Sequence, residues 1–137
     1  PAYEKYFAAE TDLAASGLVD VLAHADFVKR TGGKPYHPPL DLYESVVNAA
    51  AASQTAVEVS SAGLRQAPQE IYPAPLFLEM FNKAGVPITL ASDAHRPEDT
   101  AWELGDVITA ARSAGYTHYL HFDSRKRIYV PLPEVTS

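Results

Sequence analysis

Residues 86–95 read Val-Pro-Ile-Thr-Leu-Ala-Ser-Asp-Ala-His, an apolar run of strand character that passes directly into a polar cluster. In extended backbone, side chains two residues apart point to the same side, so Asp93 and His95 can reach one ion or two neighbouring ions. A carboxylate oxygen and an imidazole nitrogen are both common metal ligands. The segment therefore predicts a strand that ends at a metal site. The simpler alternative is that Asp93 caps the next helix and His95 is an exposed side chain.

The segments on either side of this strand continue an alternation of helices and strands. Helical spacing with Pro and Gly near the ends predicts helices over residues 3–16, 40–52, 73–84 and 98–114. Strand-like runs cover 18–23, 55–59, 86–91, 117–122 and 128–132. This order is typical of parallel βα units, so we expect one α/β unit over residues 1–137, with the last strand closing a sheet edge. The strands are too few for a closed barrel, which leaves an incomplete α/β barrel or an open doubly wound sheet.

The composition limits the classes of function. The 137 residues are 47% hydrophobic, enough for one buried core, and the net charge of −6 argues against a nucleic-acid surface. The basic run Arg125-Lys126-Arg127 lies between two strand-like segments and is expected to form a hairpin turn. Cys is absent, which excludes disulfides and thiolate metal sites and fits a cytoplasmic protein. The sequence has no uninterrupted apolar stretch long enough to predict a membrane span.

Polar clusters follow three successive strands of the predicted sheet. His24 lies after the first strand, residues 58–61 end the second, and residues 92–95 follow the third. In barrels and open α/β sheets alike, sites form at the carboxyl ends of parallel strands, so we expect these clusters to converge. His24, Asp93 and His95 are therefore candidate metal ligands, and a buried structural role for His24 is the alternative.

Four segments carry a resemblance to a known family. They are LAHADFVKR at 22–30, VEVSSAGLR at 57–65, EIYP at 70–73 and LASDAH at 90–95. In this order and spacing they resemble the C-terminal half of PHP-domain metallophosphoesterases, most closely the histidinol-phosphatase type. The Ser-Asp-Ala-His element with an upstream His-x-Asp is typical of PHP domains, and the Gly-Leu-Arg and Tyr-Pro elements are typical of the phosphatase branch.

The resemblance implies a fold and a cofactor. The fold would be the C-terminal part of a distorted (β/α) barrel of PHP type, incomplete in this chain, with up to three divalent ions (Zn, Mn or Fe) in a complete domain. It implies His24, Asp93 and His95 as metal ligands. The family takes its other ligands from an N-terminal half that begins with a His-x-His pair, and these 137 residues contain no such pair. The chain therefore resembles half a catalytic domain, and we expect this fragment alone to be inactive.

Other polar residues receive secondary roles. Arg65, just past a strand end, is a candidate phosphate ligand because guanidinium groups pair bidentately with phosphate oxygens, and the resemblance adds Arg30; solvent-facing charges are the alternative. Glu58 is interpreted as a group supporting a metal-bound His or as a member of a buried network. His118 and His121 lie three apart on a strand, hence on opposite faces, which argues against a shared site.

The resemblance predicts metal-dependent hydrolysis of a phosphomonoester, most specifically histidinol phosphate to histidinol and phosphate in histidine biosynthesis. Metal ions would lower the pKa of a bound water so that hydroxide attacks phosphorus, and Asp93 would also assist proton movement to the leaving alkoxide. The partners expected are a small phosphorylated substrate, with no nucleic acid and no membrane. An incomplete barrel exposes strand edges, which also predicts a homo-oligomer or segment exchange. The alternatives are a PHP-type phosphodiesterase or nuclease, and a catalytically silent fragment.

Overall fold

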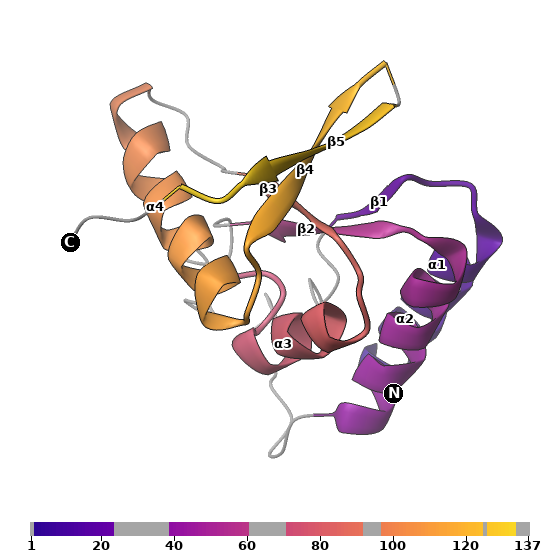
Figure 1. Cartoon of the computed structure of the whole chain (residues 1–137). Helices are drawn as coiled ribbons and strands as arrows, with labels where there is room; N and C mark the ends of the chain where they lie inside the picture. The colour runs from indigo at the N-terminus through magenta and orange to yellow at the C-terminus, as the bar shows by residue number, and fades with distance from the viewer. Residues whose placement is uncertain (1, 24–38, 61–70, 92–96, 125, 134–137) are drawn as a thin grey trace.

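The computed structural model describes residues 2–23, 39–60, 71–91, 97–124 and 126–133. The described elements alternate between helices and strands as far as β4, and β5 follows β4 directly, which confirms a mixed α/β fold (Figure 1). They are α1 (Ala2–Ser16), β1 (Val21–Leu22), α2 (Leu40–Ser53), β2 (Ala56–Ser60), α3 (Pro75–Lys83), β3 (Ile88–Ala91), α4 (Pro97–Ser113), β4 (His118–Asp123) and β5 (Lys126–Pro131). Among the residues described, no helix combines the length and apolar character that crossing a bilayer requires.

Local sequence signals explain the ends of the helices. Gly17 follows α1 with a φ of +70°, a left-handed conformation that glycine adopts without strain. Pro75 begins α3, where its fixed φ suits the first turn and its missing N–H has no helical acceptor. These boundaries confirm the predicted helices to within a few residues.

The central sheet contains three parallel strands in the order β1-β2-β3. Val57 of β2 is level with Leu22 of β1 and with Ile88 of β3, and Ser60 is level with Ala91. β1 is shorter than predicted, because Leu18 is 83% exposed and strand pairing begins only where the N–H of Ala56 donates to the carbonyl of Asp20. The sheet therefore has β2 at its centre and the other two strands at its sides.

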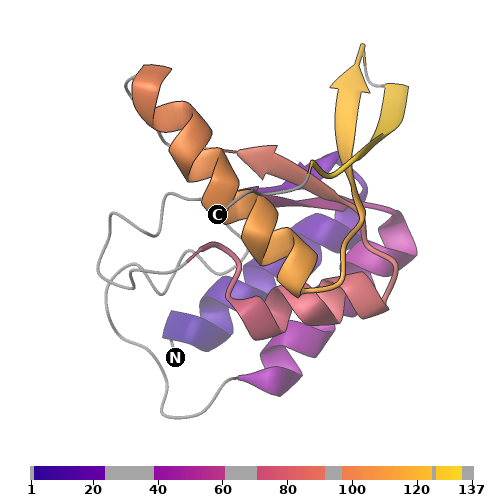
Figure 2. The ribbon, with the colours of Figure 1, turned by 60° about the vertical axis from the view of Figure 1, so that its left-hand side comes forward.

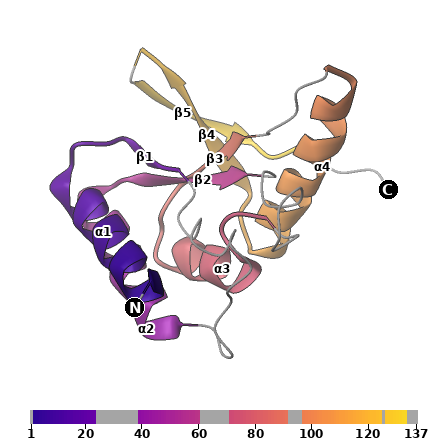
Figure 3. The same cartoon turned by 180° about the vertical axis from the view of Figure 1, so that it is seen from behind.

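The two faces of this sheet differ in chemistry. Leu22, Val57, Val59 and Ile88 share one face and are at most 1% exposed. The opposite face carries mainly small and polar side chains, with one valine: Val21, Ala56, Glu58, Ser60, Thr89 and Ala91. Figures 2 and 3 show α1, α2 and α3 on one side of the sheet and the tip of the β4–β5 hairpin pointing away from them.

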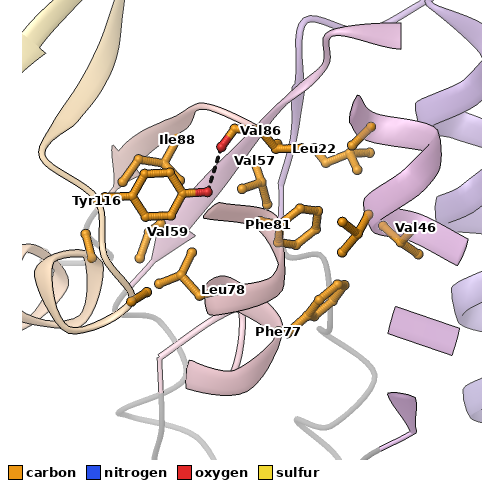
Figure 4. Close-up of a cluster of buried hydrophobic side chains, with 14 of the residues drawn as sticks. Leu22, Val46, Val57, Val59, Phe77, Leu78, Phe81, Val86, Ile88 and Tyr116 are labelled. Atoms are coloured by element: carbon orange, nitrogen blue, oxygen red, sulfur yellow. Dashed lines mark hydrogen bonds between the residues drawn. The ribbon is translucent and has the colours of Figure 1, made fainter. Parts of the chain in front are cut away.

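The hydrophobic core lies between the apolar sheet face and the helices. Phe77 of α3 stacks on Tyr43 of α2, with ring centroids 4.1 Å apart, and on Phe81, at 4.5 Å. Phe7 of α1 meets Phe77 edge-on at 5.7 Å, so one aromatic cluster joins three helices. Figure 4 shows these α3 rings beside the valines of β2. This packing fixes the helices under the sheet and thereby fixes the direction in which the strand ends point.

The last two strands correct the prediction. β4 and β5 pair antiparallel in a separate two-stranded sheet, so among the described strands β4 does not continue the parallel series and β5 does not close its edge. For β5 the physical reason is the short connection at residues 124–125: a parallel pairing with β4 needs a crossover of a dozen residues or more, whereas a tight turn returns the chain as a hairpin. The hairpin expected around the basic run is confirmed, although Lys126 and Arg127 lie on β5.

Candidate active site at the carboxyl ends of the parallel strands

The predicted site residues fall just beyond the described strands. His24 and Arg30 lie in residues 24–38, Arg65 lies in 61–70, and Asp93 and His95 lie in 92–96, all outside the described residues. The structure describes the strands β1, β2 and β3, which directly precede these residues in the sequence. Leu22 ends β1 two residues before His24, and Ala91 ends β3 two residues before Asp93.

The strand ends that precede these residues lie at one edge of the sheet. Because β1, β2 and β3 run parallel, their carboxyl ends point the same way. Neighbouring strands are about 4.8 Å apart, so β1 and β3, on either side of β2, are separated by about 10 Å. An imidazole and a carboxylate reaching inward from two such strands, each with a metal bond of about 2 Å, span that separation around one ion or an adjacent pair. The described backbone thus fits the proposed donor set.

The end of β2 also bears on Arg65. The N–H of Ser60 donates to the carbonyl of Tyr72 at 2.8 Å, and the N–H of Tyr72 donates back to the carbonyl of Ser60 at 3.0 Å. This bridge holds both ends of the segment 61–70, which contains Arg65, beside the carboxyl end of the central strand. Both residues are buried, with Tyr72 at 0% and Ser60 at 3% exposure. Arg65 itself lies outside the described residues, and its role as a phosphate ligand stays a prediction.

Glu58 is the acidic side chain of β2 and lies two residues before the strand end. It is half-buried and shares the small, polar face of the sheet with Ser60, as the strand alternation predicts. Within the described parts of the chain, its carboxylate has neither a hydrogen bond nor an ion pair. Neither of the two roles considered for Glu58, support of a metal-bound His or membership of a buried network, has a described partner, and both stay hypotheses.

A second buried carboxyl escaped the sequence analysis. Glu10 of α1 is half-buried, its Oε2 has no hydrogen-bond partner among the residues described, and burial raises its pKa from 4.5 to about 7. The signal was present in the sequence: Phe7, Glu10 and Ala14 follow the i, i+3, i+7 spacing of one helix face, and Phe7 and Ala14 are core residues.

The remaining histidines of the described chain do not form a second metal site. His118 and His121 lie on β4, are exposed, and belong to opposite faces of the strand, which confirms the sequence interpretation. Within the described residues, no group of three or more His, Cys, Asp or Glu side chains is placed to hold a metal. The candidate ligands His24, Asp93 and His95 lie outside these described residues, so their role as a metal site stays a prediction.

The comparisons with known proteins agree with the resemblance in part. No protein-family model matches the chain. A protein of Deinococcus radiodurans named "Probable histidinol-phosphatase" is 31% identical over 113 residues, which are 82% of this chain and 43% of that protein. The chain thus spans less than half the length of the curated relative that it matches. It is similar over most of its length to part of that protein.

Proposed function

We propose that this chain contributes to a metal-dependent phosphomonoesterase that converts histidinol phosphate to histidinol and inorganic phosphate. One structural observation carries the proposal: β1, β2 and β3 are adjacent and parallel, and their shared carboxyl edge leads within two residues to His24 and Asp93. The similarity to the Deinococcus protein supports the phosphatase chemistry and the substrate. A place in histidine biosynthesis and a cytoplasmic location belong to the same proposal.

The proposed roles follow from the chemistry of each side chain. His24, Asp93 and His95 would hold divalent ions, Zn, Mn or Fe. Such an ion supplies an activated water at neutral pH and offsets charge on phosphoryl oxygens. Arg65 and Arg30 would donate hydrogen bonds to the phosphate, orienting it for in-line attack. In such a site a water oxygen would bond to phosphorus as the bond to the histidinol oxygen breaks, and Asp93 would assist transfer of a proton to that leaving oxygen.

The arrangement of the helices supports the barrel part of the proposal. Core residues of α2, α3 and α4 pack with the apolar face of the sheet, whereas a doubly wound sheet has helices on both faces. The opposite face, with Glu58, Ser60 and Thr89, has the small and polar character suited to the interior of a barrel near its site. We therefore propose the C-terminal part of a distorted (β/α) barrel of PHP type.

The test is hydrolysis by the purified full-length protein with Mn²⁺, Zn²⁺ or Fe²⁺ added. We expect phosphate release from histidinol phosphate to exceed release from a generic aryl phosphate, and no cleavage of a labelled oligonucleotide. Asp93→Asn should lower the rate by about a hundredfold or more, because the substitution removes a metal ligand and a proton carrier. Asp123→Asn, an exposed change on the hairpin, is the matched control and should leave the rate unchanged.

Two outcomes would overturn the proposal. Absence of hydrolysis with every metal would favour a catalytically silent protein. Oligonucleotide cleavage without phosphomonoester hydrolysis would favour the nuclease reading. The acidic balance, with 17 Asp and Glu against 11 Lys and Arg, argues against that second result.

A further inference from the structure

Two adjacent cavities lie at the amino end of β3. This is the end of the strand opposite the candidate active site, which lies at the carboxyl ends. The larger has a volume of about 430 Å³ and the smaller about 340 Å³. They share the lining residues Gly85, Val86, Pro87 and Tyr129, so they are adjacent, and we name the pair of cavities the amino-end groove. Each of the two volumes falls in the range of binding sites for small organic molecules.

The amino-end groove is free of acidic side chains in an acidic protein. Asp and Glu outnumber Lys and Arg by 17 to 11 in the sequence, yet among the residues described neither cavity has an Asp or a Glu in its lining. Arg127 lines the smaller cavity, and His118 lines the larger one. This charge distribution favours a ligand that carries a negative group.

The hairpin presents three of these side chains in a row. In the antiparallel register, Leu120 faces Tyr129 and Phe122 faces Arg127, so Arg127, Tyr129 and His118 alternate onto one face of the hairpin. Tyr129 is 61% exposed and lines both cavities, which leaves its ring available for stacking. Arg127 and Tyr129 are two residues apart on β5, about 7 Å along the strand. That spacing suits a molecule in which an anionic group is attached directly to a ring.

Local contacts orient the side chains of Arg127 and His118 and leave some of their ring or guanidinium nitrogens available to a ligand. Arg127 donates one N–H to the carbonyl of Gln54, and its guanidinium carbon lies 5.8 Å from the ring centroid of Phe122. Its other N–H groups have no partner in the part of the chain that is described. The Nδ1 of His118 lies 2.8 Å from the hydroxyl of Thr117, which leaves Nε2 for a ligand.

We propose that the amino-end groove binds a small aromatic carboxylate, with its ring on Tyr129 and its carboxylate on Arg127. The guanidinium pairs with the carboxylate through parallel N–H donors, and the stacked ring excludes water from that pair. Nothing in this site depends on the hydrolytic site, since no groove residue belongs to the proposed metal or phosphate ligands. The inference therefore stands or falls independently of the phosphatase proposal.

The experiment is a fluorescence titration of the purified full-length protein with anthranilate, in the presence of a chelator so that no metal ion can hold the carboxylate elsewhere. We expect saturable binding of anthranilate. Aniline, which lacks the carboxylate, and acetate, which lacks the ring, should compete at least about tenfold more weakly. Equal competition by aniline, or no saturable binding of anthranilate at millimolar concentration, would overturn the proposal.

Variants assign the binding to the groove. Arg127→Met should raise the dissociation constant by about tenfold or more, because a charge-assisted hydrogen bond is lost. Lys126→Met removes a charge from the neighbouring residue of β5, which is exposed and lines neither cavity, and should change it by less than about twofold. Equal effects of the two substitutions would contradict the site. If Arg127→Met fails to fold, Tyr129→Ser decides: loss of binding supports the groove, and unchanged affinity refutes it.

Discussion

At the scale of single residues, Glu10 shows how the pKa of a carboxyl rises when its side chain lies on a packed helix face. Its side chain lies on the same stripe of α1 as Phe7 and Ala14, which belong to the core. Desolvation by burial disfavours the charged form and raises the pKa of Glu10 to about 7. The folded protein therefore holds this proton more tightly than the unfolded chain does, where the ordinary value is 4.5.

The raised pKa of Glu10 predicts that the free energy of unfolding depends on pH. Below about pH 4.5 the carboxyl is protonated in both states, and as pH rises toward about 7 the folded state loses stability relative to the unfolded state. Because part of the side chain remains in solvent, we expect an effect of about 1 kcal/mol. Glu10→Gln should remove it, so the difference in free energy of unfolding between Glu10→Gln and the parent protein should grow from pH 4.5 to 7.5.

Urea unfolding at both pH values measures this difference. Glu4→Gln, an exposed change on the same helix, is the control and should show no growth with pH. If the difference in free energy of unfolding between Glu10→Gln and the parent protein is the same at both pH values, the raised pKa of Glu10 is refuted.

The candidate ligands illustrate what a sequence reveals at this scale. Asp93 and His95 could be singled out because their spacing and their place after an apolar run both point to one chemistry. The amino-end groove could not, because Gly85, His118 and Arg127 come from different segments. Only the tertiary fold brings those segments together, and no local spacing encodes it. Glu10 was readable from helix periodicity, but a polar residue on an apolar stripe does not by itself indicate acidity.

At the scale of secondary-structure elements, periodicity located the helices and strands but did not identify strand partners. α1, α2 and α3 begin and end close to the predicted residues, because Gly and Pro act locally on the backbone. The pairing of β4 with β5 depends on how the chain turns at residues 124–125, and a strand-like pattern is the same for a parallel or an antiparallel neighbour. The correction therefore concerns topology and leaves the three parallel strands of the candidate site unchanged.

The hairpin is attached to the sheet by Tyr116, which lies two residues before its first strand. The hydroxyl of Tyr116 donates to the carbonyl of Val86 at 2.6 Å, next to the start of β3, and the residue is 8% exposed. Burial also raises the pKa of Tyr116, so the hydroxyl stays protonated and remains a donor. Figure 4 shows this bond at the edge of the core.

Tyr116→Phe should therefore reduce the free energy of unfolding by about 1 to 2 kcal/mol, since a buried carbonyl loses a donor. Tyr129→Phe is the matched control: the residue is 61% exposed, and its hydroxyl has no hydrogen bond among the described residues. It should change stability by less than about 0.5 kcal/mol. Chemical denaturation of the two variants compares them directly, and equal losses would show that the Tyr116 bond does not anchor the hairpin.

At the scale of the whole molecule, the described sheet has edges and surfaces that a complete barrel would cover. The outer edge of β1 has no strand partner among the described residues, and Leu18 and Leu40 are 83% and 50% exposed. Unpaired strand edges promote pairing with other chains. We therefore propose that the 137-residue chain self-associates or exchanges segments.

Light scattering at tens of micromolar should give a mass of at least two chains, falling toward one chain on dilution. A single-chain mass at every concentration would contradict this expectation. The single-unit organisation over residues 1–137 stays a prediction from the sequence.

The proposed phosphatase activity depends on the convergence of His24, Asp93 and His95 at one edge of the parallel sheet. Metal analysis of the purified full-length protein and its variants tests this convergence most directly. The parent protein should carry at least one divalent ion per chain, and His24→Ala and Asp93→Ala should each lose bound metal even though they follow different strands. His118→Ala and His121→Ala, exposed changes on the hairpin, should retain it. Full metal content in both His24→Ala and Asp93→Ala would contradict the shared site.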